Sequence, residues 1–160
     1  MNKPAFVSKK VLNLVADIGI VLIFAFFTGC EQKPAPEIVP KAIEVPPRNV
    51  APEKLALGKS VYLKYCHTCH GDDGVGTKDW RKRDANGKFP PPPLNGNGHT
   101  WHHSISTLKN QIYNGGKEFG GEMPAFGDKL NEQEIESVIL WIQSLWPEKT
   151  YQAWYEMQHQ

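Results

Sequence analysis

The run Cys66-His67-Thr68-Cys69-His70 places two thiols three positions apart and an imidazole directly after the second thiol. This spacing is the attachment motif of c-type haem, in which both sulfurs bond to the porphyrin edge. The adjacent His70 is then the expected proximal ligand of the iron. The motif therefore predicts one covalently bound haem c.

Two other kinds of site use a Cys-x-x-Cys pair. A structural zinc site needs two further Cys or His ligands at close spacing, and a thioredoxin-type dithiol follows a strand in a βαβ pattern. The chain shows neither a second ligand pair of this kind nor a strand pattern of useful length. We therefore prefer haem attachment.

Helical patterns lie on both sides of the motif. Pro52 suits a first helical turn, and apolar residues then recur on one face as far as Tyr65. A second helix is expected over residues 104–113, ended by the sequence Asn114-Gly115-Gly116. These patterns place the Cys-x-x-Cys-His motif at the end of a helix.

A last helix is signalled most clearly. Asn131 with Glu134 three residues later forms a capping-box pattern, apolar residues follow at helical spacing, and Pro147 ends the run. With several helices and no strand pattern, the predicted fold class is all-α.

Several separate segments resemble the class I, monohaem cytochrome c family over most of the stretch from Glu53 to Trp146. The resemblance implies a small all-α fold with helices packed around one haem, and Gly58 and Trp141 match the positions where the first and last helices of that family cross. The matching segments are Leu55, Gly58, Val61 and Tyr62 before the motif, Gly71 after it, Pro92-Pro93-Leu94, Gly120 to Phe126, and Trp141.

The resemblance also implies roles for two further residues. In that family a methionine before a proline supplies the second axial ligand, and Met123 stands at this place. A proline carbonyl of the family accepts the other N–H of the proximal imidazole. The Pro-x-Leu pattern assigns this carbonyl to Pro92, with a neighbour in the run Pro90 to Pro93 as the alternative. The expected site is Cys66, Cys69, His70, Met123 and Pro92, with His70 and Met123 as metal ligands. Apolar candidates around the haem are Leu94, Trp101, Ile105, Phe119, Phe126 and Trp141.

The N-terminal segment has the pattern of an export signal. Three lysines precede an apolar run over residues 18–27, which is well short of the ~20 residues of a spanning helix. Thr28-Gly29-Cys30 resembles a bacterial lipoprotein signal, although Phe27 stands where a smaller aliphatic residue is usual. We expect a signal peptide over residues 1–29 and lipidation at Cys30; an uncleaved apolar anchor and an incidental free thiol are the alternatives.

Composition divides the rest of the chain. We expect residues 30–52 to be a Pro-rich, lipid-anchored linker and residues 53–147 to be the cytochrome c domain. Residues 148–160 are expected to be a tail that forms a short helix. This arrangement predicts a domain on the periplasmic side of a bacterial membrane.

The charge pattern limits the partners. The formal net charge is +1, so the sequence does not indicate nucleic-acid binding. The sequence shows neither a phosphate-binding loop nor paired catalytic acids, so we expect no small-molecule substrate. The segment from Gly74 to Gly98 carries a basic run that is either a docking patch or a solvated loop. His99, His102 and His103 receive no assigned role.

The expected function is a membrane-tethered one-electron carrier between a redox protein donor and a redox protein acceptor, rather than an enzyme. One alternative is a small haem peroxidase or gas sensor in which Met123 is labile. The other is a haem subunit of a larger oxidoreductase complex.

Overall fold

The computed structural model describes residues 43–160. The predicted signal peptide, Cys30 and most of the predicted linker lie outside the described residues. Within residues 43–160 the regular structure is helical, and the only β-type pairing is an isolated bridge between Phe89 and Gly121. The all-α prediction is confirmed. No helix in this part of the chain combines the length and apolar character needed to span a membrane.

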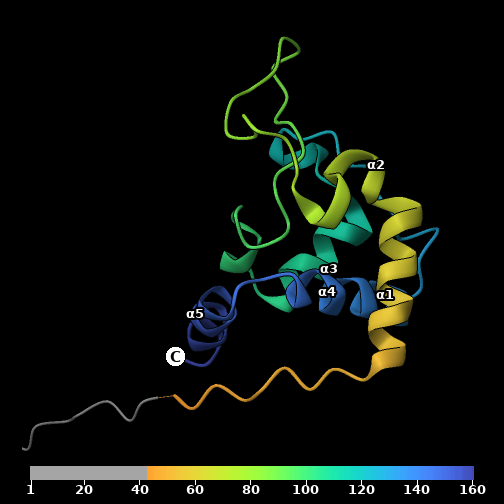
Figure 1. Ribbon diagram of the computed structural model, residues 1–160. Coiled ribbons are helices and arrows are strands. Elements are labelled where there is room, and N and C mark those ends of the chain that lie inside the picture. Colours follow the sequence, from red (N-terminus) through yellow and green to blue (C-terminus); the bar gives the residue numbers. More distant parts are fainter. Residues whose placement is uncertain (1–42) are drawn as a thin grey trace, which may run out of the picture. The chain divides into compact units, whose positions relative to one another are not determined.

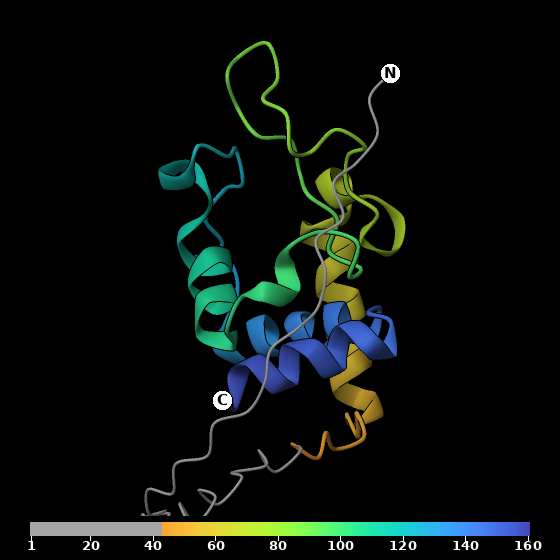
Figure 2. The same ribbon diagram turned by 90° about the vertical axis from the view of Figure 1, so that its left-hand side faces the viewer.

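Five α-helices and three single 3₁₀ turns make up the described part (Figures 1 and 2). The helix predicted over residues 104–113 begins one residue later, because the Ser104 side chain accepts the Thr107 N–H at 3.1 Å and acts as the N-cap. The bounds are α1 (Pro52–Tyr65), α2 (His67–His70), η1 (Asp72–Gly74), η2 (Thr100–His102), α3 (Ile105–Asn114), η3 (Lys117–Phe119), α4 (Glu132–Ser144) and α5 (Glu148–Gln158).

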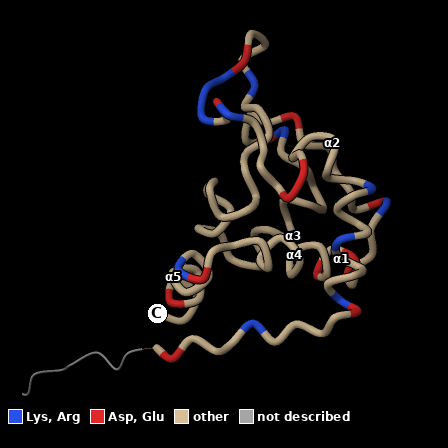
Figure 3. The backbone as a smooth tube through the Cα atoms, viewed as in Figure 1, with Lys and Arg blue, Asp and Glu red and all other residues tan. Residues whose placement is uncertain are grey.

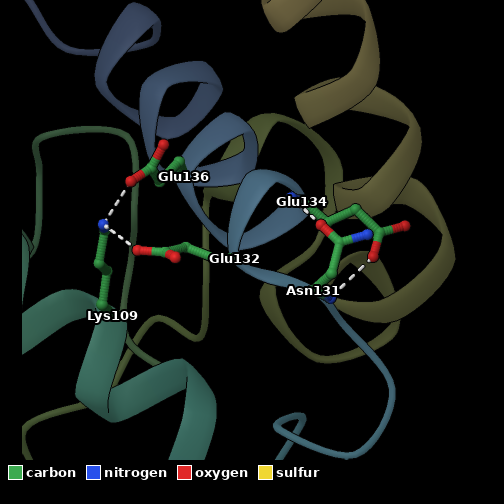
Figure 4. Close-up of polar contacts among 5 residues, drawn as sticks. All are labelled: Lys109, Asn131, Glu132, Glu134 and Glu136. Atoms are coloured by element: carbon green, nitrogen blue, oxygen red, sulfur yellow. Dashed lines mark hydrogen bonds and ion pairs between the residues drawn. The ribbon is translucent and has the colours of Figure 1, made fainter.

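Both ends of α4 are fixed by local hydrogen bonds. Asn131 Oδ1 accepts the Glu134 N–H at 3.0 Å and Glu134 Oε2 accepts the Asn131 N–H at 2.9 Å, which is the predicted capping box (Figure 4). The helix ends at Ser144, before Pro147, because a tightened last turn at Leu145 already closes it.

An ion pair outside the core ties α3 to α4. The Lys109 ammonium contacts the Glu132 carboxylate at 3.4 Å and also the Glu136 carboxylate, one helical turn further along α4 (Figure 4). The two carboxylates raise the pKa of Lys109, and the bond to Lys109 lowers the pKa of Glu136. Both shifts favour the charged forms of Lys109 and Glu136.

The core centres on the crossing of α1 and α4. A Cβ atom on Gly58 would lie 2.0 Å from the Ser137 carbonyl oxygen and 2.8 Å from the Trp141 Cβ, so only glycine allows this approach. One turn further along α1, the Tyr62 ring packs on the Trp141 ring with centroids 4.3 Å apart. The buried apolar residues around the crossing are Val61, Tyr62, Phe126, Leu130, Ile135, Val138, Ile139, Trp141, Ile142, Trp146 and Trp154.

The C-terminal segment is the helix α5, and it packs on the domain. Trp154 is 8% exposed, and its indole N–H donates to the His103 carbonyl at 3.1 Å. Trp146, just before α5, donates its indole N–H to the Leu94 carbonyl at 2.8 Å. The tail therefore closes over the segment that follows the Pro-rich run.

The last residues of the predicted linker contact the domain. The Arg48 guanidinium donates to the Gln143 and Trp146 carbonyls at 2.9 and 2.8 Å and to the Glu148 carboxylate at 2.6 Å. These carbonyls lie at the C-terminal end of α4, where a cation also offsets the helix dipole. Arg48, which lies within the predicted linker, is therefore bonded to the end of α4.

Gly58→Ala should destabilise the protein strongly, because the added methyl collides with backbone atoms of α4 rather than with a flexible side chain. We expect a loss of about 3 kcal/mol in the free energy of unfolding, measured by urea denaturation of the haem-loaded protein. Ser60→Ala, at an exposed position of the same helix, is the control and should change stability by less than about 0.5 kcal/mol. Equal stability of the two variants would mean that the helices do not cross at Gly58.

Candidate haem site

The Cys-x-x-Cys-His motif lies on one helical turn. Cys66 follows the last residue of α1, and α2 then holds the rest of the motif. The Cys69 and His70 N–H groups both donate to the Cys66 carbonyl, at 3.1 and 3.0 Å. Residues three positions apart on a helical turn share a face, so the two sulfurs are presented to the same side. Neither cysteine forms a disulfide within the described part of the chain, so both sulfurs are available for thioether bonds.

The environment of Cys66 distinguishes this pair from a reactive dithiol. Burial, with a smaller contribution from Cys69, raises the pKa of the Cys66 thiol to about 11. Catalytic dithiols instead carry a cysteine whose pKa is lowered toward or below neutrality. Before haem is attached, Cys66 is therefore a neutral thiol in a largely buried setting. Among residues 43–160, no three His, Cys, Asp or Glu side chains are grouped so as to hold a metal ion.

His70 is held by its Nδ1 atom. The ring is buried, and Nδ1 lies 2.9 Å from the Pro92 carbonyl oxygen. A carbonyl can only accept, so Nδ1 carries the proton and the Nε2 lone pair is free to bind a metal. Burial lowers the pKa of His70 more than this hydrogen bond raises it, which keeps the imidazole neutral. A hydrogen bond of this kind fixes the ring and makes Nε2 a better donor to iron.

Close backbone packing sets the position of Pro92. The Gly76 N–H donates to the His70 carbonyl at 2.7 Å, and a Cβ on Gly76 would lie 2.4 Å from the Pro93 nitrogen. Gly76 has φ of +63° in addition, so a side chain would be both strained and obstructed. The Pro-rich run therefore lies directly against the segment that follows His70, and Pro92 is the member of the run that faces the imidazole.

Tyr62 connects the helix crossing to the motif. Its hydroxyl donates to the Gly71 carbonyl at 2.7 Å, directly after His70, and burial raises its pKa to about 12. The Tyr62 ring packs on Trp141 of α4. The crossing of α1 and α4 is therefore linked through one side chain to the residue next to His70.

Met123 lies in a glycine-rich segment after α3. Its carbonyl accepts the Gly116 N–H at 2.9 Å, and a Cβ on Gly115 would lie 2.7 Å from the same oxygen. The side chain is half-buried and packs against the core cluster to which Cys66 is also packed. The Gln111 amide donates to Met123 Sδ at 3.7 Å. The thioether is thus oriented by a side chain of α3.

Gln111 is a site residue that sequence reasoning missed. A glutamine in the middle of a helix carries no signal of its own. The Gly115-Gly116 turn was the only sequence feature that could have indicated this contact. A reversal of the chain there brings the following segment, with Met123, back along the end of α3.

Most of the apolar residues expected around the haem lie at the edge of the core. Leu94, Trp101 and Ile105 are partly buried against the core cluster, and Phe126 and Trp141 belong to it. Phe119 is the exception, because its side chain is 65% exposed at the end of η3. The contact of Phe119 with the haem stays a prediction, because this exposed fraction is that of the polypeptide alone.

The three neighbouring histidines stack on aromatic rings. His99 lies on Trp80 with ring centroids 5.1 Å apart and meets His103 edge-on at 5.2 Å, while His102 stacks on Trp101 at 3.7 Å. Burial, together with the charges of His103, His102 and Arg81, lowers the pKa of His99. Their contacts are those of packing residues.

Residues 53–142 match the protein family described as cytochrome c oxidase, cbb3-type, subunit III. Quinohemoprotein alcohol dehydrogenase ADH IIB of Pseudomonas putida is 30% identical over 126 residues, which are 78% of this chain but only 16% of that protein. Cytochrome c6 of Cladophora glomerata is 34% identical over 88 residues, 54% of this chain and 82% of that protein. No match was found among solved structures.

Replacing both Cys66 and Cys69 by alanine should abolish covalent haem attachment, since no other described cysteine is available to form a thioether. The denatured protein should then have the mass of the polypeptide alone. The single variants should retain one bond and give a reduced yield of haem-loaded protein. A covalent haem adduct in the double variant would contradict attachment at this motif.

Proposed function

Because this chain belongs to the monohaem cytochrome c family and carries covalently bound haem c, we propose that it is a membrane-tethered carrier of single electrons between redox proteins outside the cytoplasm. Haem c supplies an Fe(III)/Fe(II) couple, and a thioether ligand favours its ferrous state. The observation that carries the proposal is the pair of oriented donors: His70, held by Pro92, and Met123, held by Gln111.

The two donors argue for a carrier rather than a peroxidase or gas sensor. His70 presents an unprotonated Nε2 and Met123 presents its Sδ, so the chain has a residue for each axial position of the iron. Enzymes that activate a substrate at iron keep one position open. The hydrogen bond from Gln111 leaves the thioether a second lone pair for the metal.

The proposed tether begins at a lipidated Cys30 on the periplasmic side of a bacterial membrane. Its support is the sequence, an apolar run followed by Thr28-Gly29-Cys30 and then repeated prolines. Because Arg48 is bonded to the end of α4, the proposed tether would comprise residues 31–47. A polyproline-like chain of that length reaches roughly 50 Å, enough to let the domain meet partners above the membrane surface.

The proposed partners are a redox protein donor and a redox protein acceptor. The basic residues between Lys78 and Lys88 gather on the loop that projects from the helices (Figure 3). Exposed charge of this kind speeds encounter with a partner of opposite charge more than it tightens the complex. Such a partner would carry an acidic surface.

A second candidate is a haem subunit of a larger oxidoreductase complex. Two findings favour it: the matching family is described as a subunit of cytochrome c oxidase, and the similarity to ADH IIB covers a small part of a larger haem protein. Purification from gently solubilised membranes separates the two functions. A carrier should be recovered alone, whereas a subunit should be recovered with a stoichiometric partner.

Met123→His should keep the iron six-coordinate and lower the reduction potential, because imidazole donates more strongly to ferric iron than a thioether does. The ferric protein should lose the sulfur-to-iron charge-transfer band, and redox titration should give the lower potential. Met157→His, the same change at a partly exposed position of α5, is the control and should leave both unchanged. A high-spin, five-coordinate spectrum of the unmodified ferric protein would favour the peroxidase or sensor.

Cys30→Ser should move the protein from the membrane pellet to the soluble exported fraction, because the lipid would then have no attachment point. The measurement is the distribution of haem absorbance after washing membranes with high salt. Arg48→Ala leaves Cys30 intact and should stay in the pellet. Retention of the Cys30→Ser protein would instead support an uncleaved anchor over residues 18–27.

A further inference from the structure

A closed loop separates the haem motif from Pro92. This segment, residues 77–91, is called the brace loop below. The Thr77 N–H donates to the Pro91 carbonyl at 2.9 Å and closes its base, and the Asp84 N–H donates to the Lys88 carbonyl at 2.8 Å near its tip. Asp84 Oδ1 also accepts the Lys88 N–H at 2.9 Å. The brace loop extends away from the helices in both ribbon views (Figures 1 and 2), yet its own hydrogen bonds give it a defined form.

The brace loop meets the segment that carries Met123, residues 115–127, which is called the methionine loop. The Phe89 N–H donates to the Gly120 carbonyl at 3.2 Å, and Phe89 pairs with Gly121 as an isolated bridge. The Gly121 N–H donates to the Gly116 carbonyl at 3.0 Å, and the Gly116 N–H donates to the Met123 carbonyl at 2.9 Å. A series of backbone hydrogen bonds thus joins Phe89 to Met123.

Arg83 covers the contact between the two loops. Its guanidinium carbon lies 4.1 Å from the centroid of the Phe89 ring, and Nη1 donates to the Gly87 carbonyl at 2.6 Å. The same guanidinium lies against Gly120, where an added Cβ would be 3.0 Å from Nη1. Gly120 has φ of +78°, a backbone conformation that favours glycine, and an added Cβ would also crowd the guanidinium. Arg83 therefore packs on both partners of the hydrogen bond between Phe89 and Gly120.

Arg81, two residues earlier, makes a different contact. Its guanidinium carbon lies 4.1 Å from the Trp80 ring centroid, and Trp80 stacks on His99. Arg81 and Arg83 share a loop, a charge and a stacking geometry. They differ in that the structure places only Arg83 against Gly120, so Arg81 is a matched control.

The base of the brace loop adjoins the proximal side of the site. Pro91, which accepts the Thr77 N–H, directly precedes Pro92, whose carbonyl accepts from His70. One loop therefore touches the support of His70 at its base and the methionine loop at Phe89.

We propose that Arg83 and Phe89 are positioning residues that keep the methionine loop closed and its thioether on the iron. This inference rests on the proposed ligation by Met123. The methionine loop contains five glycines, which gives its open form a high conformational entropy. A thioether is a weak donor, so its ligation depends on how firmly the loop is held. The contacts with Phe89 and Arg83 are external to the methionine loop and favour its closed form.

The test uses the haem-loaded full chain with Arg83→Ala and Phe89→Ala. Imidazole added to the ferric protein competes with Met123 for the iron, so its binding measures how readily the methionine loop opens. Loss of one stacked cation should tighten imidazole binding about three- to tenfold in Arg83→Ala. When the pH is raised, the sulfur-to-iron band should disappear at a lower pH than in the unmodified protein. The Gly116 and Gly121 amides should also exchange hydrogen faster.

The controls separate contact from charge and from folding. Arg81→Ala removes the same charge from the same loop and should behave as the unmodified protein. Phe89→Tyr keeps the aromatic ring, so its imidazole affinity should equal that of the unmodified protein. Phe89→Ala removes the ring and should bind imidazole more tightly. Arg83 is exposed, so Arg83→Ala should fold and load haem normally.

Three results would overturn the inference. In the first, the unmodified protein shows the sulfur-to-iron band, and Arg83→Ala changes neither this band nor the imidazole affinity. Met123 would then remain the ligand, and Arg83 would have no positioning role. An equal effect of Arg81→Ala would assign the effect to charge. Absence of the band from the unmodified ferric protein would remove Met123 as the ligand, and both the proposed function and this inference would be wrong.

Discussion

The close crossing of α1 and α4 at Gly58 is the constraint on which the other elements depend. The two helices are far apart in the sequence, and they can touch because position 58 has no side chain to hold Ser137 and Trp141 away. The crossing fixes the direction of α1, and α1 ends at the first haem-attachment cysteine. Tyr62 packs on Trp141 at this crossing and donates its hydroxyl to the carbonyl of Gly71, the residue after His70. The position of His70 thus depends on the backbone contact made at Gly58.

The two side chains proposed as axial ligands, His70 and Met123, are held in different ways. His70 sits on a short helix, is buried, and is bonded to a proline carbonyl in a run of restricted backbone, so little freedom remains to it. Met123 sits in a glycine-rich segment and is oriented by Gln111 and by backbone contacts from neighbouring loops. A rigidly held His70 and a more adaptable Met123 are compatible with the proposed one-electron carrier.

The ends of the chain's described part belong to the same packed unit. Arg48 binds the C-terminal carbonyls of α4 and the Glu148 carboxylate at the start of α5. Trp146 and Trp154 then attach α5 to the Leu94 and His103 carbonyls. Segments that composition alone assigns to a linker and a tail therefore add contacts to a small domain, in which a bound cofactor supplements a limited core.

Features governed by neighbours in the sequence could be predicted from it. The haem-attachment motif depends on spacing within one helical turn, and the capping box of α4 depends on Asn131 and Glu134 alone. The helical fold class follows from apolar periodicity. Features governed by distant contacts could not: the choice of Pro92 among four prolines rests on a resemblance in the sequence and on the packing of Gly76 in the structure. The contact of Gln111 with Met123, the exposure of Phe119 and the packing of Arg83 between two loops appear only when the chain is folded. Such contacts join residues whose separation leaves no periodic signal, and long-range packing alone brings them within bonding distance.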